Sequence, residues 1–150
     1  MNDVRDLYES LILDHNRHPR NVKIPAGCNH QSHGMNPLCG DDITVYLTVE
    51  DGVIKDAGFK GNGCAISTAS ASLMTEALKG KSVSEAEELF KNMHHLLTQE
   101  GDEKTDLDRL GKLKVLSGVH EFPARVKCAT LAWHTMHAAL ADEQKTITTE

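Results

Sequence analysis

The clearest pattern along the chain is a strict alternation of apolar and polar residues over positions 42–50. Such a period of two predicts a β-strand with one buried face. The face expected to be buried carries Ile43, Val45, Leu47 and Val49. The pair Asp51-Gly52 follows, which is a strong signal for a two-residue hairpin turn, and residues 53–60 are therefore predicted to form the returning strand.

Most of the remaining chain has apolar residues at helical spacing. The helices predicted from this spacing cover residues 3–16, 64–79, 84–98, 107–116 and 123–141. Ser84 and Glu87 are expected to form a capping box at the start of the third helix. Gly80 is expected to end the second helix, and Pro123 is favoured in the first turn of the last one.

Two segments show neither the alternation of a strand nor the apolar spacing of a helix. Residues 19–40 are rich in Pro, Gly, Asn and His, so we expect mostly loop with at most one short edge strand. The polar tail, residues 142–150, is expected to be frayed. The order of a helix, a strand pair and several helices predicts an α+β fold, in which a small antiparallel sheet of about three strands is covered by helices on one face. The length fits a single domain over residues 1–150.

Composition and charge limit the class of protein. The chain is 39% hydrophobic and 25% charged, as in an ordinary globular domain. Its formal net charge of −6 gives no general attraction to nucleic acid or to anionic membranes, so neither is expected as a partner. No apolar stretch approaches the ~18 residues of a membrane span, and the N-terminus lacks the basic and apolar regions of a signal peptide. We therefore expect a cytoplasmic protein.

Four cysteines in such a chain favour metal or redox chemistry over structural disulfides. Cys39 is followed by Gly40, which lets the backbone turn sharply, so that the Asp41 carboxylate can reach a metal held by the Cys39 thiolate. Cys64 lies between a Gly-rich break and a predicted helix start, where the helix dipole favours a thiolate. Cys128 lies in the second turn of the last predicted helix, after two basic residues that also favour a thiolate.

These three cysteines and Asp41 are the candidate metal ligands. Three thiolates and a carboxylate suit tetrahedral zinc, and the same thiolates can instead hold an iron–sulfur cluster. The chain has no C-x-x-C pair, so spacing alone leaves open the alternative that the cysteines are small buried hydrophobic residues. Asp42 is an alternative to Asp41 as the carboxylate ligand, and Cys28 is interpreted as an incidental loop cysteine.

The sequence around each candidate ligand carries further information. The three segments are Asn36-Pro37-x-Cys39-Gly40-Asp41, Gly63-Cys64-Ala65-Ile66-Ser67 and Arg125-Val126-Lys127-Cys128-Ala129-Thr130-Leu131-Ala132-Trp133. In this order they resemble the IscU/NifU N-terminal family of iron–sulfur cluster assembly proteins, and within it the SufU branch. The resemblance covers residues 3–140 and implies an IscU/SufU-like fold.

Two departures from IscU-type scaffolds favour the SufU branch. The segment before Cys128 lacks the Leu-Pro-Pro-Val-Lys chaperone motif, and Lys127 stands where IscU-type proteins have His. The stretch between Cys64 and Cys128 is also longer than in IscU, by about the length of one helix. Docking of the matching Hsp70-type chaperone is therefore not expected.

The resemblance implies a mechanism and partners. SufU-type proteins bind zinc and accept sulfur from a pyridoxal-phosphate cysteine desulfurase of the SufS type, acting as sulfurtransferase-like accessory proteins. By position, Cys39 is the persulfide acceptor, and Asp41, Cys64 and Cys128 hold the zinc with it. Arg125 matches the family's basic residue near the site and is expected to contact the partner or the negative charge of the site.

The sulfur would then pass to the downstream iron–sulfur assembly machinery. Two alternatives remain open. The first is an IscU-type scaffold, in which the same ligands assemble and transfer a [2Fe–2S] cluster or bind iron. The second is a non-catalytic adaptor in which zinc only stabilises the fold.

Overall fold

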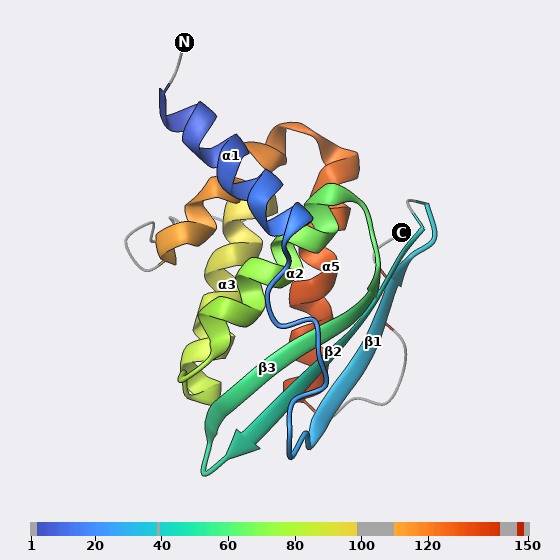
Figure 1. The fold of residues 1–150 in the computed structure, drawn as a ribbon, viewed down its shortest axis with the longest axis vertical. Coiled ribbons are helices and arrows are strands. Elements are labelled where there is room, and N and C mark those ends of the chain that lie inside the picture. The colour runs from blue at the N-terminus through green and yellow to red at the C-terminus, as the bar shows by residue number, and fades with distance from the viewer. Residues whose placement is uncertain (1–2, 39, 99–109, 142–146, 149–150) are drawn as a thin grey trace.

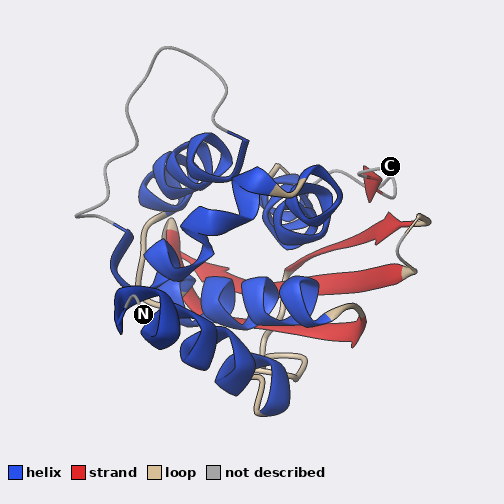
Figure 2. Cartoon of the chain, turned by 90° about the horizontal axis from the view of Figure 1, so that it is seen from above, coloured by secondary structure: helices blue, strands red, loops and turns tan. Residues whose placement is uncertain are grey.

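The structure is a computed structural model that describes residues 3–38, 40–98, 110–141 and 147–148. In these ranges a four-stranded sheet is covered by helices on one face (Figures 1 and 2). The predicted α+β class is confirmed, with one strand more than the three expected. No helix in the described ranges is both long and apolar enough to cross a membrane.

The sheet has the strand order β3-β2-β1-β4. Its strands are β1 (His30–Asn36), β2 (Asp41–Glu50), β3 (Val53–Asn62) and β4 (Ile147–Thr148). The first three pair antiparallel, and the predicted alternation holds, since Ile43, Val45 and Leu47 of β2 are buried. The predicted hairpin turn is confirmed, because Asp51 and Gly52 both have positive φ, at 52° and 74°.

Two expectations about the sheet are wrong. β1 is a seven-residue strand between β2 and β4, not a short edge strand in a loop. The residues of β1 that share the inner face with Val45 are polar or small, so hydrophobic alternation gave no signal there. Part of the tail is also ordered rather than frayed: β4 pairs in parallel with Gly34 and Met35. Residues 142–146 and 149–150 lie outside the described residues.

The helices are α1 (Asp3–Arg17), α2 (Ala65–Leu78), α3 (Val83–Thr98), the 3₁₀ helix η1 (Gly111–Glu121) and α5 (Pro123–Leu140). Pro123 begins α5 as predicted, and Gly80 follows α2 with a φ of 86°. Of the short helix predicted at 107–116, residues 107–109 are not described and Leu110 is α-helical. The 3₁₀ helix η1 follows from Gly111 and extends beyond the predicted end.

The capping box of α3 lies two residues before the predicted one. Ser82 N donates to Glu85 Oε1 at 3.0 Å, and Glu85 N donates to Ser82 Oγ at 3.1 Å. The prediction of Ser84 and Glu87 is therefore wrong. Ser82 is held in place by the β2–β3 hairpin, because it forms an isolated bridge with Val53.

The segment between α1 and β1 crosses the other face of the sheet (Figure 1). Phe59 N donates to Asn21 O at 3.0 Å, and Thr48 Oγ1 donates to Ala26 O at 2.9 Å. Gly58 is needed under this segment, because a Cβ there would collide with the carbonyl oxygen of Lys23. The sheet is thus covered by helices on one face and in part by this strap on the other.

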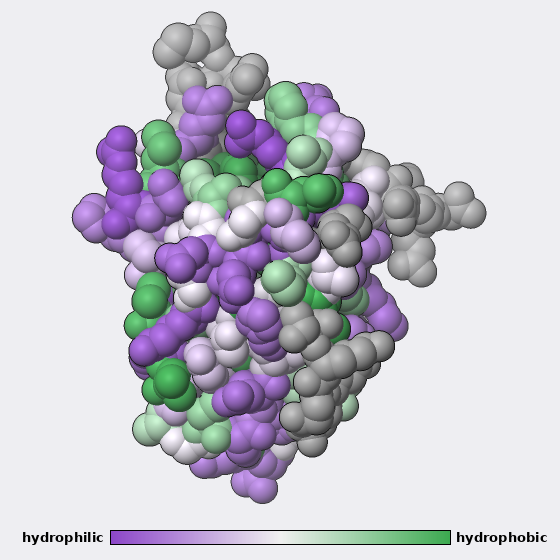
Figure 3. Space-filling view, turned by 90° about the vertical axis from the view of Figure 1, so that its right-hand side faces the viewer, coloured by the Kyte–Doolittle hydropathy of each residue, from purple (hydrophilic) through white to green (hydrophobic). Residues whose placement is uncertain are grey.

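The core lies between the sheet and the helices. α5 packs on β1 and β2 and also contacts α2 and α3, which makes it the central element. The largest fully buried side chains include Trp133, Leu73, Met74 and Leu47. On the face in Figure 3, hydrophilic side chains separate small groups of hydrophobic ones. This packing brings the first residues of α2, α5 and β2 to the same region of the molecule.

Candidate metal centre

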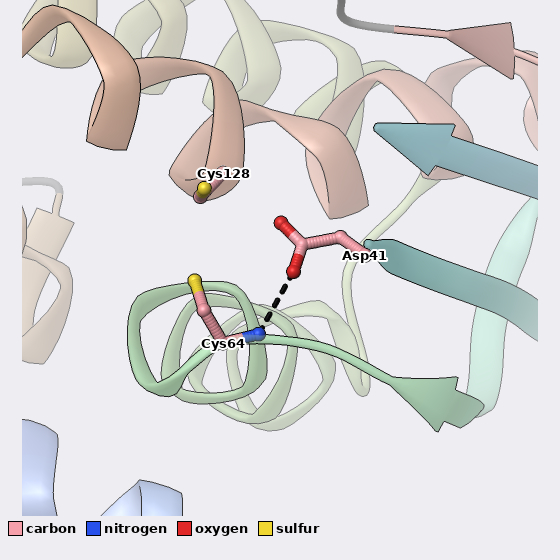
Figure 4. A group of neighbouring side chains, drawn as sticks. All are labelled: Asp41, Cys64 and Cys128. Atoms are coloured by element: carbon pink, nitrogen blue, oxygen red, sulfur yellow. Dashed lines mark hydrogen bonds between the residues drawn. The ribbon is translucent and has the colours of Figure 1, made fainter. Parts of the chain in front are cut away.

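Three of the four predicted ligands meet at one point (Figure 4). Asp41 is the first residue of β2, Cys64 directly precedes α2, and Cys128 lies in the second turn of α5. Their ligand atoms, one carboxylate oxygen and two sulfurs, all lie within 4.8 Å of one another. Three elements that are distant in sequence therefore converge on a space of the size that a metal ion occupies.

Asp41 has one satisfied and one unsatisfied carboxylate oxygen. Its Oδ1 accepts a hydrogen bond from Cys64 N at 2.8 Å, which ties the start of β2 to the start of α2. Its Oδ2 is buried and has no hydrogen-bond partner among the described residues. Burying a carboxylate oxygen without a partner is costly unless a cation neutralises it. The orphaned oxygen therefore fits a metal ligand.

Cys64 is the N-cap residue of α2. Its backbone is extended, with φ −69° and ψ 172°, and its Sγ accepts a hydrogen bond from Ser67 N at 3.4 Å. A sulfur in this position faces the positive end of the helix dipole, which stabilises a thiolate. Cys64 therefore lies at a helix start, as the sequence predicted, in a position that favours a thiolate.

Cys128 is 3% exposed, and its Sγ donates to Ala124 O at 3.5 Å. The two basic residues that precede this buried cysteine, Arg125 and Lys127, are both exposed. The guanidinium carbon of Arg125 lies 5.9 Å from the centre of the exposed Phe122 ring. Arg125 is thus at the surface, one turn of helix before a buried ligand.

Cys39, the fourth predicted ligand, lies outside the described residues. Its neighbours are well placed: Asn36 and Asp41 are paired across β1 and β2, and Gly40 has the positive φ of 74° that the turn argument requires. Gly40 N donates to Asn36 O at 2.9 Å. The hydrogen bond between Gly40 and Asn36 therefore joins the two ends of the β1–β2 connection directly before the candidate ligand Asp41.

The alternatives weighed from sequence lie elsewhere. Asp42 is exposed and pairs with His33 Nε2 at 2.6 Å, on the face of the sheet opposite Asp41. Cys28 Sγ donates to His30 O at 3.4 Å, at the far end of β1 from Asn36. Neither belongs to the ligand group found within the described ranges.

The donor set fits zinc. Two sulfurs and a carboxylate oxygen are ligands that zinc takes in tetrahedral sites, and Cys39 supplies a candidate for the fourth position. Ser67, in the first turn of α2, is a residue of this site that sequence reasoning missed. It is fully buried beside Cys64, and its Oγ has no partner among the residues described.

The chain is similar to known proteins over most of its length. The profile of the NifU-like N terminal domain matches residues 7–129. The chain is 40% identical over 138 residues to the zinc-dependent sulfurtransferase SufU of Bacillus subtilis, which covers 92% of each chain. It is 48% identical over 134 residues to the iron–sulfur cluster assembly scaffold protein IscU of Thermotoga maritima, covering 89% of this chain and 92% of that one.

Solved structures show the same fold. The crystal structure of a putative iron–sulfur cluster assembly scaffold protein for the SUF system from Fervidobacterium islandicum matches with a TM-score of 0.82 and 32% identity. The match covers 91% of this chain and 98% of that one. Because the profile and the relatives span nearly the whole sequence, the chain belongs to the NifU-like N-terminal domain family.

Proposed function

We propose that this protein is a zinc-binding sulfur acceptor in iron–sulfur cluster assembly. It takes persulfide sulfur from a cysteine desulfurase on Cys39 and passes it to the downstream assembly machinery. The observation that carries the proposal is the buried, unpartnered Oδ2 of Asp41 beside the sulfurs of Cys64 and Cys128. The likeness to a zinc-dependent sulfurtransferase supports this choice of metal.

Asp41, Cys64 and Cys128 would hold the metal, together with Cys39. When bound, zinc keeps its cysteine ligands deprotonated at neutral pH. The chain contributes by holding the ligands in place: the Cys64 backbone amide fixes Asp41 Oδ1, and the Ser67 amide fixes Cys64 Sγ. The burial of Asp41 and Cys128 keeps water away from that side of the site.

The sulfur transfer is an exchange between a thiolate and a persulfide. The Cys39 thiolate attacks the terminal sulfur of the desulfurase persulfide, a new S–S bond forms on Cys39, and the desulfurase cysteine leaves as a thiolate. No net oxidation occurs, because one S–S bond replaces another. Arg125, exposed near the start of α5, is proposed to contact the desulfurase or to balance the negative charge of the site.

The second candidate function is a scaffold that assembles and transfers a [2Fe–2S] cluster. The same thiolates suit a cluster, and the likeness to scaffold proteins named IscU favours this candidate. Anaerobic reconstitution with iron and sulfide distinguishes the two. A stable visible chromophore supports the scaffold, whereas a colourless protein that retains zinc contradicts it.

Desulfurase turnover tests the sulfur-acceptor proposal. Sulfide release from cysteine is measured with the desulfurase of the same organism, alone, with the zinc-loaded protein and with its Cys39→Ala variant. Cys28→Ala is the matched control, because Cys28 lies beside His30, at the end of β1 far from the candidate ligands. We expect stimulation that is lost in Cys39→Ala and kept in Cys28→Ala. Equal stimulation by both variants, or none by the wild type, would contradict the proposal.

A further inference from the structure

The hydroxyl of Ser67 lies unused beside the candidate ligands. Ser67 is 0% exposed, and its Oγ has no hydrogen-bond partner within the described part of the chain. Its backbone amide already donates to Cys64 Sγ. A buried hydroxyl without a partner is unfavourable, so such a group at a functional site calls for a missing interaction.

The helix start explains why the hydroxyl has no local partner. In a capping box, the side chain three residues after the N-cap accepts a hydrogen bond from the N-cap amide. Here Cys64 is the N-cap and Ser67 occupies that third position, but the Cys64 amide donates to Asp41 Oδ1 at 2.8 Å. The Asp41 carboxylate, on the sheet, thus accepts the hydrogen bond that the Ser67 side chain would accept in a capping box.

Gly63 leaves space between these groups. A Cβ added at Gly63 would lie 2.9 Å from Ser67 Oγ and 3.2 Å from Asp41 Oδ1, so both oxygens border the same small volume. A hydroxyl can donate and an ionised carboxylate can only accept, so the two groups are chemically matched. Because Gly63 has no side chain, no atom of its own fills the volume that these two oxygens border.

We propose that Ser67 is a positioning residue of the metal centre, and this inference rests on the proposed metal site. In the loaded protein the Ser67 hydroxyl donates to Asp41 Oδ1, which then accepts two hydrogen bonds. Oδ1 is thereby occupied, and the Asp41 carboxylate offers only Oδ2 to the metal. Groups that orient metal ligands in this way typically account for about 10–100-fold in metal affinity.

The test is a zinc affinity measurement by competition with a chromophoric chelator, on wild type and Ser67→Ala. Ser32→Ala is the matched control, because Ser32 on β1 is 6% exposed and its Oγ is also buried without a partner. We expect Ser67→Ala to bind zinc about 10-fold more weakly and Ser32→Ala to bind like the wild type. Thermal unfolding of both metal-free variants is expected to stay at or above the wild-type midpoint, since each loses an unsatisfied hydroxyl.

The cobalt(II) form supplies a readout that a purely structural role would not move. We expect Ser67→Ala to shift the visible ligand-field bands, because Asp41 then binds the metal in another way, while Ser32→Ala leaves them unchanged. Wild-type zinc affinity and unshifted bands in Ser67→Ala would overturn the role of Ser67 alone. Failure of the wild type to bind zinc would overturn the metal centre and this inference with it.

Discussion

The indole nitrogen of Trp133 donates a hydrogen bond to the hydroxyl of Ser70 at 3.1 Å, across the buried interface between α5 and α2. The same hydroxyl donates to Ala129 O at 2.7 Å. Ser70 thus connects the two helices that position Cys64, the N-cap of α2, and Cys128, in the second turn of α5. A polar link at this point fixes the rotation of one helix against the other, which hydrophobic contacts alone specify less well.

Substitution of Ser70 by Ala is expected to destabilise the protein. The indole N–H of Trp133 would remain buried without an acceptor, which costs about 1–3 kcal/mol in the free energy of unfolding. Urea denaturation of the metal-free protein measures this loss. Ser84→Ala, at an exposed position in the first turn of α3, serves as the control and should change little. Equal stability of both variants would show that the link contributes nothing.

Substitution of Asp41 by Asn is expected to weaken zinc binding. The amide can still accept from Cys64 N, but the negative charge at Oδ2 is lost, so we expect a fall of at least about 10-fold in affinity. The matched variant is Asp42→Asn, whose carboxylate faces the other side of the sheet and pairs with His33. Competition with a chelator measures the zinc affinity of both variants. A larger loss of affinity in Asp42→Asn than in Asp41→Asn would contradict the assignment of Asp41 as the ligand.

The alternation of residues along β2 already places Asp41 and Asp42 on opposite faces of the sheet. Asp41 shares its parity with Ile43 and Val45, so the alternation that predicts β2 also turns Asp41 toward the core. The hairpin and the start of α5 could likewise be predicted, because each has a local signal in Asp51-Gly52 or Pro123. These features depend on residues that are close in sequence.

Other features depend on distant contacts and could not be predicted. β1 is held by pairing with β2, and Gly34 lies so close to α5 that a Cβ would collide with Thr135 Oγ1. Two overlapping capping signals, at Ser82 and Ser84, were equally good locally, and the bridge to Val53 selects the first. The role inferred for Ser67 arises only because Asp41 reaches the Cys64 amide from another element.

Removal of the Arg125 side chain is expected to separate partner binding from metal binding. Arg125 is exposed, and its contact with the Phe122 ring contributes about 0.5–1 kcal/mol at such a site. Arg125→Ala should therefore keep its zinc affinity and most of its stability but stimulate the desulfurase less. Arg17→Ala, which removes an exposed cation from α1, is the control. Full stimulation by Arg125→Ala would exclude a role in docking.

Acid is expected to destabilise the metal-free protein partly through His15, which is fully buried between α1 and α2. Its Nδ1 contacts Ser72 Oγ at 2.7 Å, its Nε2 has no partner among the described residues, and burial lowers the pKa of His15 below 6.5. The unfolded chain therefore takes up this proton first, so the stability that neutral His15 permits is present above about pH 6.5 and is lost as pH falls. One proton gives a slope of at most about 1.4 kcal/mol per pH unit.

Urea denaturation between about pH 7.5 and about pH 5.5 should show a smaller slope of unfolding free energy against pH for His15→Gln than for wild type. Parallel curves would contradict the assignment and leave His134, whose pKa is also lowered by burial, as the alternative source.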